Sequence, residues 1–408
     1  MNSFDTVKTN YKHSFVKSNP EMLTSMFGTT DVIPLWIADM DFEVAVPIKE
    51  ALQELIDRNI YAYEFNTTGI YKAIIDWNVK RHQLKLNPES FVQVTSVLTG
   101  IAVLIKELTN KGEGVMIQTP VYHQFANVIK STGRKVVANP LKIVEGKYRM
   151  DLATIENNFK EEAVKLFLLC NPHNPVGRVW RKEELEELVR LANAYGVTII
   201  SDEIHSDIVY AKATFHSIAS LNESDNHIVI LGSPAKTFGM QSISNGYLYI
   251  KNEAIHEKIK KVVSSMYLDH GSIIAGNATI AAYTKGEKWL DELLSYLENT
   301  LSWIETFLEK ELPQVKLFTP EGTYQIWLDF RELGLSDKAL EHVIVKQAKL
   351  ALAPGSWFES SHTQFMRMNI ASPLETIQKV FGQLKKAIDN GVDENFNENE
   401  EASSTCSC

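Results

Sequence analysis

Short apolar runs alternate with amphipathic stretches through the middle of this chain, and no other feature limits its possible folds as strongly. The apolar runs, each short enough to be a buried strand, cover residues 114–118, 164–169, 197–201, 228–231 and 247–250. Helical patterns lie between them, such as residues 182–192, whose apolar side chains share one face, and Gly196 is placed to end that helix. The alternation predicts an α/β domain with a mostly parallel sheet.

The pattern changes near residue 289, which indicates a second, smaller α+β domain. Its expected elements are a helix over 289–308, a strand over 324–330, a helix over 336–349, a strand over 364–370 and a helix over 374–388. We expect residues 1–45 to pack with this domain, 46–288 to form the large domain and 289–390 to form the small one. Residues 391–408 are acidic and poor in apolar side chains, so we expect them to be disordered.

Composition and charge argue against several classes of protein. A formal net charge of −10 and the lack of a long Lys/Arg stripe argue against a nucleic-acid surface. No segment reaches the ~18 apolar residues that a membrane helix needs, and residues 1–12 contain no apolar leader, so a cytoplasmic protein is expected. Cys170 closes an apolar run and is interpreted as a buried strand residue, whereas a metal or redox role stays open for Cys406 and Cys408.

Polar residues follow several of the expected strands. Lys236 lies in Gly232-Ser233-Pro234-Ala235-Lys236-Thr237-Phe238, Asp202 opens Asp202-Glu203-Ile204-His205, and Asn174 lies in Asn171-Pro172-His173-Asn174-Pro175-Val176-Gly177. Ligands of parallel sheets bind beyond the carboxyl ends of the strands, where these residues fall. In this order they are what pyridoxal phosphate (PLP) requires: an amine for a Schiff base, a carboxylate for the pyridine nitrogen and an amide for the ring oxygen.

Each of these residues also has an ordinary structural interpretation. The alternatives are a helix N-cap for Asp202 and a turn residue for Asn174, since Asn-Pro pairs start turns. Tyr122 is a candidate to stack on the ring face, with a buried core tyrosine as its alternative. In the PLP interpretation, Lys236 binds the cofactor and later takes a proton from the substrate's α-carbon, while Asp202 keeps the ring nitrogen protonated.

The phosphate of the cofactor is expected near Ser96, Val97 and Leu98, where a strand over 91–94 turns into a helix with free backbone N–H groups. Ser233 is expected to add a hydroxyl. The chain has no GxxxxGK[ST] loop, which argues against a nucleotide site.

Arg367 is flanked by apolar residues in the run 365–369, and a guanidinium in an apolar strand must find an anion. Its planar fork suits the α-carboxylate of an amino acid, and a buried structural salt bridge is the alternative. No metal is expected, because the spacing of Asp202 and His205 is not accompanied by a second cluster of His or Cys.

These motifs resemble the fold-type I PLP enzymes of the class I/II aminotransferase superfamily. More closely, they resemble the bacterial C–S β-lyases of the MalY/PatB group, which is cystathionine β-lyase-like. The resemblance extends from residue 35 to about residue 388. Its motifs are Leu35-Trp36-Ile37-Ala38-Asp39-Met40-Asp41-Phe42, Cys170-Asn171-Pro172-His173-Asn174-Pro175-Val176-Gly177-Arg178-Val179-Trp180, Ser201-Asp202-Glu203-Ile204-His205 and Pro320-Glu321-Gly322-Thr323-Tyr324.

The resemblance implies a large domain with a mostly parallel seven-stranded sheet, PLP as cofactor, and a homodimer with shared active sites. It also implies the roles already assigned to Lys236, Asp202, Asn174, Tyr122 and Arg367. Tyr63 resembles the tyrosine that reaches the phosphate bound by the neighbouring subunit. We further expect His205 beside the cofactor, and Asp39 and Tyr122 beside the substrate.

Two enzymatic functions fit these residues: β-elimination of a cysteine thioether to a thiol, pyruvate and ammonia, and amino-group transfer. His205 favours elimination, because typical aminotransferases carry a tyrosine three residues after the aspartate. A regulatory binding protein on an aminotransferase scaffold is a third possibility. Ala235 and Ser244 depart from the family's pattern, which leaves the substrate open among cystathionine, cysteine, bulkier S-conjugates and Cys-Gly conjugates.

Overall fold

The computed structural model describes residues 3–6, 14–64, 67–161, 163–221, 227–393 and 396. The chain forms two compact units. The central unit comprises Val44–Leu294 and Glu321–Thr323, and the terminal unit comprises Met1–Glu43, Ser295–Pro320 and Tyr324–Cys408. The short segment Glu321–Thr323 therefore belongs to the central unit, although the chain on both sides of it belongs to the terminal unit.

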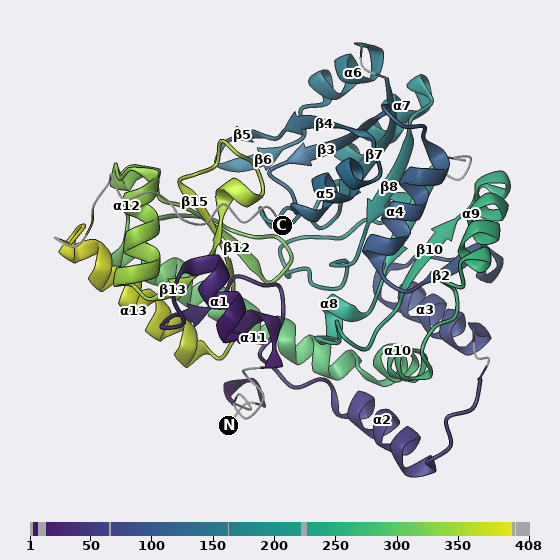
Figure 1. Cartoon of the computed structure of the whole chain (residues 1–408), viewed down its shortest axis with the longest axis horizontal. Coiled ribbons are helices and arrows are strands. Elements are labelled where there is room, and N and C mark those ends of the chain that lie inside the picture. The colour runs from purple at the N-terminus through teal and green to yellow at the C-terminus, as the bar shows by residue number, and fades with distance from the viewer. Residues whose placement is uncertain are drawn as a thin grey trace. The chain divides into compact units, whose positions relative to one another are not determined.

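A seven-stranded sheet in the order β2-β10-β9-β8-β7-β3-β4 forms the middle of the central unit (Figure 1). β10 runs antiparallel to both of its neighbours and the other pairs are parallel, so the predicted mostly parallel sheet is confirmed. Its strands are β2 (Phe91–Val94), β3 (Gly114–Thr119), β4 (Lys135–Pro140), β7 (Val164–Cys170), β8 (Thr198–Asp202), β9 (Ile228–Gly232) and β10 (Gly246–Ile250).

The five strands expected from apolar runs are all present, with both ends within one residue of the prediction. Strands such as β3, β8 and β9 are buried at every position, and strands covered on both faces appear in a sequence as continuous apolar runs. The edge strand β4 alternates between exposed and buried residues and carries Pro140, so it has no such run and was not expected.

Helices pack on both faces of this sheet (Figure 1). Their bounds are α2 (Val46–Arg58), α3 (Thr67–His82), α4 (Val97–Leu108), α5 (Gln124–Ser131), α6 (Leu152–Glu161), α7 (Lys182–Tyr195), α8 (Ala235–Phe238), α9 (Glu253–Ser265) and α10 (Ile273–Lys285). The predicted end of α7 is confirmed, because Gly196 adopts φ 65° there and donates its N–H to the Ala192 carbonyl.

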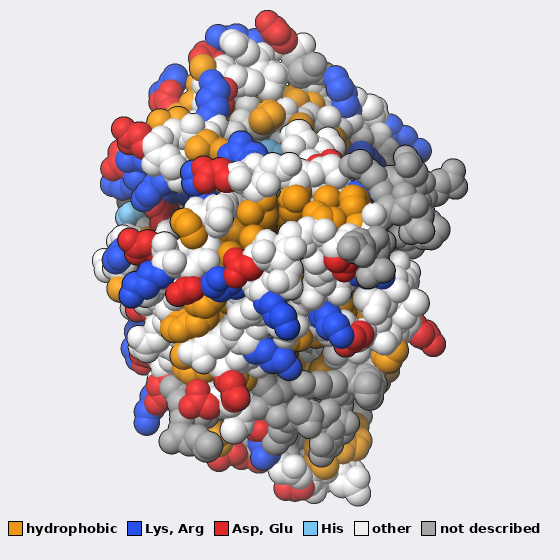
Figure 2. All heavy atoms as spheres, turned by 90° about the vertical axis from the view of Figure 1, so that its left-hand side faces the viewer, with side chains coloured by type: hydrophobic (Ala, Val, Ile, Leu, Met, Phe, Trp, Pro, Cys, Tyr) orange, Lys and Arg blue, Asp and Glu red, His pale blue; other side chains and the backbone are white. Residues whose placement is uncertain are grey.

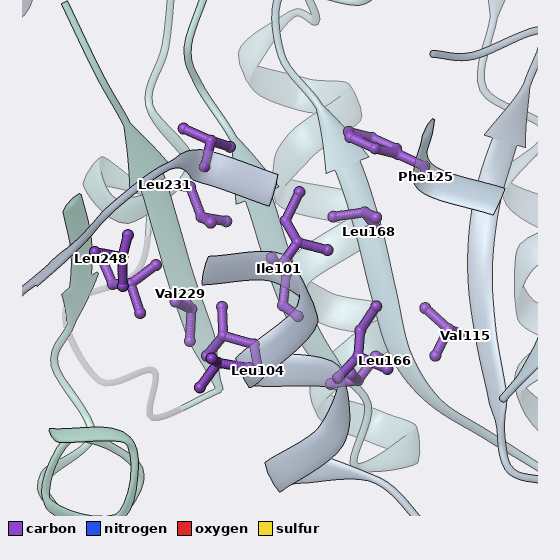
Figure 3. Close-up of a cluster of buried hydrophobic side chains, with 14 of the residues drawn as sticks. Ile101, Leu104, Val115, Phe125, Leu166, Leu168, Val229, Leu231 and Leu248 are labelled. Atoms are coloured by element: carbon purple, nitrogen blue, oxygen red, sulfur yellow. The ribbon is translucent and has the colours of Figure 1, made fainter. Parts of the chain in front are cut away.

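The core between α4 and the sheet is built from aliphatic side chains (Figure 3). Ile101 and Leu104 point from α4 toward Leu166, Val229 and Leu248 on the strands, and each of these five side chains is fully buried. Such close packing makes the position of α4 on the sheet rigid. The start of this helix is therefore held in place beside the carboxyl ends of the strands.

A β-hairpin of β5 (Lys142–Val144) and β6 (Lys147–Arg149) extends from the end of β4. Its two-residue turn is Glu145-Gly146, with φ 51° and 72°, the left-handed conformation that a tight hairpin requires at both positions. The hairpin carries Lys147 and Arg149, which form ion pairs with Glu321 and Glu184.

The terminal unit contains an antiparallel sheet in the order β11-β12-β15-β14 and a parallel pair β1-β13. Its strands are β1 (Ile33–Pro34), β11 (Lys316–Phe318), β12 (Gln325–Asp329), β13 (Leu350–Ala351), β14 (Ala353–Pro354) and β15 (Phe365–Asn369). Its helices are α1 (Pro20–Phe27), α12 (Asp337–His342) and α13 (Leu374–Asn390), with α11 (Glu287–Glu311) running into it from the central unit.

One helix expected for the terminal unit is wrong in detail. The single helix predicted over residues 336–349 is α12 followed by a π-helical turn, Val343–Gln347. The turn begins with three buried β-branched residues, which fit an α-helix poorly because their χ1 rotation is restricted. Beyond α13, Asp393 lies 3.0 Å from the His342 ring. Of the expected disordered tail, residues 391–393 and 396 are described and the others lie outside the described residues.

Lys and Arg side chains are interspersed with Asp and Glu on the face drawn in Figure 2, and the described residues there form no continuous basic stripe. Within the described ranges, no helix is long and apolar enough to cross a membrane.

Candidate active site

The carboxyl ends of β7, β8 and β9 are aligned with one another. Cys170 pairs with Asp202, and Asp202 pairs with Leu231, so these three residues lie side by side across the sheet. The Asn171 N–H also donates to the Asp202 carbonyl at 3.0 Å. The segments that carry Asn174 and Lys236 therefore leave the sheet at the level of the Asp202 carboxylate. The structure places three of the predicted site residues at one edge of the sheet.

Asp202 is a buried carboxylate whose charge depends on its neighbours. Its side chain accepts one backbone hydrogen bond, from the Ile204 N–H at 3.1 Å. Burial raises the pKa of Asp202 to about 7, although that hydrogen bond and the positive charge of Lys236 both lower it. Because burial disfavours the ionised form, a cation against this carboxylate would restore its charge at neutral pH.

Lys236 lies on α8, a single helical turn between β9 and Gly239. Gly239 adopts φ 66° and ends the turn by donating its N–H to the Ala235 carbonyl. Phe238 anchors the turn: its ring is fully buried, and its centroid lies 5.7 Å from that of Trp77 and 5.9 Å from that of Trp289. The Lys236 backbone is therefore held by packing on its carboxyl side.

Tyr122 and Asn174 are brought together by contacts between the segments after β3 and β7. The Tyr122 N–H donates to the Asn174 carbonyl at 3.2 Å, and the His173 Nε2 lies 2.9 Å from the Pro120 carbonyl oxygen. Burial lowers the pKa of His173 to about 4, so the ring is neutral and donates through Nε2. Tyr122 is partly buried against the core, which keeps one part of its ring accessible.

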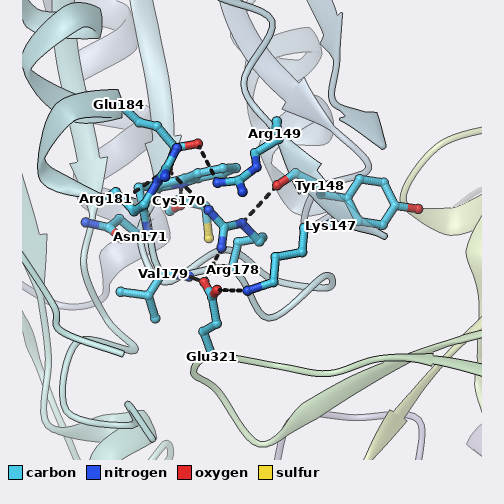
Figure 4. A network of polar contacts seen from close by, with 11 residues as sticks. Lys147, Tyr148, Arg149, Cys170, Asn171, Arg178, Val179, Arg181, Glu184 and Glu321 are labelled. Carbon is cyan, nitrogen blue, oxygen red and sulfur yellow. Dashed lines mark hydrogen bonds and ion pairs between the residues drawn. The ribbon is translucent and has the colours of Figure 1, made fainter. Parts of the chain in front are cut away.

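A network of ion pairs holds the turn that contains Asn174 (Figure 4). The buried Arg178 guanidinium pairs with Glu321 and with Glu184, the latter at 3.2 Å, and donates to the Tyr148 carbonyl at 2.9 Å. Lys147 binds the second Glu321 oxygen at 3.1 Å. Only the sequence resemblance drew attention to Glu321, since nothing in its local pattern indicates a partner so distant along the chain.

The backbone of the segment Glu321–Thr323 is fixed as firmly as its carboxylate. The Glu321 N–H donates to the Gly177 carbonyl at 2.7 Å, and the Thr323 N–H donates to the Ile208 carbonyl at 2.7 Å. At Gly322 an added Cβ would lie 2.7 Å from that same Ile208 oxygen, so this position excludes any side chain. The segment therefore braces the turn after β7 against the loop that follows Asp202.

The expected phosphate position is the start of α4. Ser96 is the N-cap and accepts the Thr99 N–H at 3.1 Å, while the first N–H groups of a helix, here those of Val97 and Leu98, have no intrahelical acceptor. β10 passes close to this turn: a Cβ on Gly246 would lie 2.9 Å from the Ser96 carbonyl carbon and from the Val97 nitrogen. Gly246 was not identified from the sequence, because its importance depends on this close approach.

The other predicted cofactor residues have different surroundings. The Ser233 hydroxyl donates to the Asn245 carbonyl at 2.8 Å and accepts the Ala235 N–H at 3.2 Å, so it holds the turn before Lys236. His205 is buried in the loop after Asp202, where its carbonyl accepts the Ile208 N–H. Tyr63 exposes its whole side chain.

Arg367 and Asp39 belong to the terminal unit, where β15 lies against the segment 36–39. Arg367 is buried, donates to the Trp36 carbonyl at 2.6 Å, and lies with its guanidinium carbon 4.8 Å from the centroid of Phe358. The Asn369 side-chain amide donates to the Asp39 carbonyl at 2.8 Å. Within this unit, the two predicted substrate residues are therefore on adjacent segments.

The described part of the chain contains no group of three His, Cys, Asp or Glu residues arranged to hold a metal. Cys170 is buried, and burial raises the pKa of its thiol, so it is a poor nucleophile. Cys406 and Cys408 lie outside the described residues.

Three features of the central unit fit PLP. Asp202 is a buried carboxylate whose charged form is disfavoured by burial, the positive charge of Lys236 acts on it, and the start of α4 offers N–H groups in a cradle that a Cβ at Gly246 would fill. A protonated ring nitrogen, an aldehyde and a phosphate are the groups that these three features would bind.

Comparison with known proteins supports the same assignment. Residues 30–384 match the family model described as aminotransferase class I and II. The chain is 37% identical to cystathionine beta-lyase PatB of Bacillus subtilis (strain 168) over 364 residues, covering 89% of this chain and 94% of that protein. It is 30% identical to protein MalY of Escherichia coli (strain K12) over 387 residues, covering 94% and 99% of the two chains.

A solved structure agrees with these relatives. The crystal structure of cystalysin from Treponema denticola, which contains a pyridoxal 5'-phosphate cofactor, superposes with a TM-score of 0.91 at 28% identity. The match covers 96% of this chain and 99% of cystalysin. The chain therefore belongs to the aminotransferase class I and II family and, within it, to the MalY/PatB group.

Proposed function

We propose that this protein is a PLP-dependent carbon–sulfur β-lyase that splits cysteine thioethers into a thiol, pyruvate and ammonia. The observation that carries this proposal is the buried Asp202 carboxyl, with a pKa raised to about 7, beside the Lys236 amine at the carboxyl edge of a parallel sheet. The cystathionine beta-lyase name of the PatB relative supports the reaction, and the PLP in cystalysin supports the cofactor.

Each residue of the central unit has a defined role in this proposal. Lys236 would hold the cofactor covalently and Asp202 would pair with its ring nitrogen. Asn174 would donate to the ring oxygen, and Tyr122 would cover one ring face. Ser96, Val97, Ser233 and the partner subunit's Tyr63 are proposed to surround the phosphate. His205 is proposed as a buried neighbour of the cofactor.

Bound PLP supplies an electron sink that makes the α-proton of an amino acid removable. Lys236 would take this proton from the substrate's α-carbon once its amine has been released from the cofactor and is neutral. As the Cα–H bond breaks, the electron pair forms a Cα–Cβ double bond and the Cβ–S bond breaks, so sulfur leaves as a thiolate that takes up a proton. Hydrolysis of the released three-carbon enamine gives pyruvate and ammonia.

Arg367 is proposed to bind the substrate α-carboxylate, and Asp39 is proposed to lie beside the substrate. Arg367 is a buried guanidinium that donates to the Trp36 carbonyl and lies over the Phe358 ring. Its planar fork of N–H donors matches the two oxygens of an α-carboxylate.

The test is formation of pyruvate from purified protein and PLP, without any keto acid, on cystathionine, an S-alkylcysteine and a Cys-Gly conjugate. Equimolar thiol and pyruvate on one or more of these is the expected result, and Lys236→Ala is the matched inactive control. Amino-group transfer that requires an added keto acid, without release of thiol, would instead identify an aminotransferase. The three substrates also decide which thioether is preferred.

We also propose a homodimer that shares its active sites. Large apolar side chains are exposed on two stretches of the chain. One is α2 with the segment after it, and the other is the start of the link between α9 and α10 with the first turn of α10. The exposed residues are Val46, Ile56, Ile60, Tyr61, Tyr63, Met266, Tyr267 and Ile274. Exposed apolar groups on neighbouring elements are typical of surfaces that bind another chain. A cytoplasmic location remains a prediction.

Shared sites can be tested by mixing two inactive variants, Lys236→Ala and Tyr63→Ala. In a mixed dimer one site carries both changes and the other carries neither, so activity should return after subunit exchange. A mixture that dimerises without regaining activity would place Tyr63 and Lys236 in the same subunit's site.

A further inference from the structure

Asp207 is a buried carboxylate that none of the roles above uses. Its Oδ1 accepts the Trp77 indole N–H at 2.8 Å and lies 2.8 Å from the His82 Nε2. Its Oδ2 accepts the Thr237 hydroxyl at 2.8 Å. A buried carboxylate that receives three hydrogen bonds is held in one orientation, because any rotation breaks at least one of them.

The two ends of this cluster are next to the two central residues of the site. Asp207 lies five residues after Asp202, in the loop that follows β8, and Thr237 is the residue directly after Lys236 on α8. The hydrogen bond between Asp207 and Thr237 therefore joins the loop directly after the proposed ring-nitrogen partner to the helical turn that carries the proposed base.

Trp77 strengthens this connection by contacting both sides of it. Its indole N–H binds Asp207, while its ring packs against Phe238, which follows Thr237. The His82 ring is also nearly buried and lies edge-on to Phe215, 5.1 Å between centroids. The last two turns of α3 thus fix the Oδ1 atom of Asp207, while α8 binds its Oδ2 atom.

The charge state of Asp207 differs from that of the other buried carboxyls of this loop. Burial raises the pKa of Asp202 and of Glu203, each to about 7. At Asp207 burial also acts to raise the pKa. The hydrogen bond and charge of His82 and the hydrogen bonds from Trp77 and Thr237 outweigh burial, so the pKa of Asp207 is lowered. Asp207 is therefore the carboxylate of this loop that stays ionised without a ligand, and its hydrogen bonds are charge-assisted.

We propose that Asp207 is a positioning residue: through Thr237 it holds the α8 turn so that the Lys236 amine keeps its place relative to the Asp202 carboxylate. This inference rests on the proposed function. Asp202 would hold the cofactor's ring nitrogen and the substrate would be bound to the same cofactor, so a fixed position of Lys236 relative to Asp202 would place its amine for proton transfer from the substrate. The rate of proton transfer and the rate at which Lys236 binds the cofactor covalently both depend steeply on the placement of the reacting atoms.

Thr237→Val is the sharpest test, since it removes the hydroxyl that binds Asp207 and keeps the shape of the side chain. Loss of a hydrogen bond to a charged group predicts a roughly 10- to 100-fold lower kcat with little change in KM. The rate at which borohydride traps PLP on Lys236 should fall as well, a readout that does not need turnover. Thr237→Ser keeps the hydroxyl and should remain close to wild type in both.

Thr300→Val is the matched control, because it removes an equally buried hydroxyl that bonds to the Tyr296 carbonyl at 3.0 Å in the other unit. It should lower the unfolding temperature without changing kcat or the trapping rate. If Thr237→Val fails to fold, the Trp77→Phe variant tests the proposal instead, since it removes the indole donor to Asp207 and keeps an aromatic ring beside Phe238. A lower kcat and slower trapping in Trp77→Phe would support the proposal.

A folded Thr237→Val protein, or in its place a folded Trp77→Phe protein, with wild-type kcat and trapping rate would overturn the positioning role. A loss in Thr237→Val that Thr237→Ser shares equally would overturn it too, because the hydroxyl would then be irrelevant. Failure of the proposed function has a different signature: wild-type protein would release neither thiol nor pyruvate from the thioethers, while the borohydride trapping rate would still report the effect of Thr237→Val.

Discussion

Replacing Asp202 by Asn should remove a pH-dependent loss of stability from the cofactor-free protein. Burial raises the pKa of this carboxyl to about 7 in the folded chain, from an ordinary value of 3.8. The folded state therefore binds the proton more tightly than the unfolded state does. The stabilisation that this proton provides is fully present below about pH 4 and is lost as the pH rises through about 7.

The size of the effect follows from the shift. One pKa unit corresponds to about 1.4 kcal/mol, so the complete shift is worth about 4 kcal/mol. Between about pH 5 and about pH 8, the carboxyl should lower the free energy of unfolding of the wild type by roughly 2–3 kcal/mol. The amide of Asp202→Asn does not titrate and can still accept the Ile204 N–H, so this variant should lack that decrease.

The assay is urea unfolding of cofactor-free wild type and Asp202→Asn at both pH values and at one protein concentration, which keeps any dimerisation contribution equal. Other titrating groups, including Glu203, are present in both proteins and cancel in the difference. Asp57→Asn on the exposed face of α2 controls for the loss of one negative charge. An identical pH dependence in wild type and Asp202→Asn would refute the reasoning.

Three further predictions concern activity and cofactor binding. Lys236→Ala should abolish pyruvate formation and the visible absorption band that PLP gives in the wild type, as a spectrum and a pyruvate assay will show. Arg367→Ala should lower kcat/KM by roughly 30- to several-thousand-fold, because a buried carboxylate loses a charge-assisted fork of about 2–5 kcal/mol. Arg367→Lys should recover little of this, and equal kcat/KM in all three proteins would remove Arg367 from the site. Glu321→Gln should weaken PLP binding about ten-fold, measured by titration, through the Asn174 turn, whereas Glu187→Gln in the exposed pair with Arg190 should not.

The sheet could be predicted from the sequence because its strands are covered on both faces. Continuous burial favours apolar side chains, so β9 and the part of β7 from Leu166 to Cys170 appear as uninterrupted apolar runs. Where burial is one-sided or the backbone departs from regular geometry, local pattern was insufficient. The edge strand β4 and the π-helical turn at Val343–Gln347 are the two clear cases.

Candidate site residues could be predicted for a related reason. Asp202, Asn174 and Lys236 come soon after strands whose carboxyl ends must meet at one edge of a parallel sheet, so their order along the chain already indicates proximity. The residue types then indicate the chemistry, since an amine, a carboxylate and an amide in this arrangement match one cofactor.

The residues that hold this site in place were decided by the tertiary structure alone. Arg178 and Glu321 are separated by 143 residues, and His82 and Asp207 by 125, so neither pair leaves a local pattern. The need for glycine at position 246 likewise arises from the approach of β10 to the start of α4. The sequence by itself determined the sheet, the order along the chain of the polar residues that follow its strands, and the chemistry that these residue types suit. It could do so because burial and local geometry act on neighbouring residues. Only the folded chain decided which distant side chains brace them, because an ion pair or a close contact constrains positions in space and not intervals along the chain.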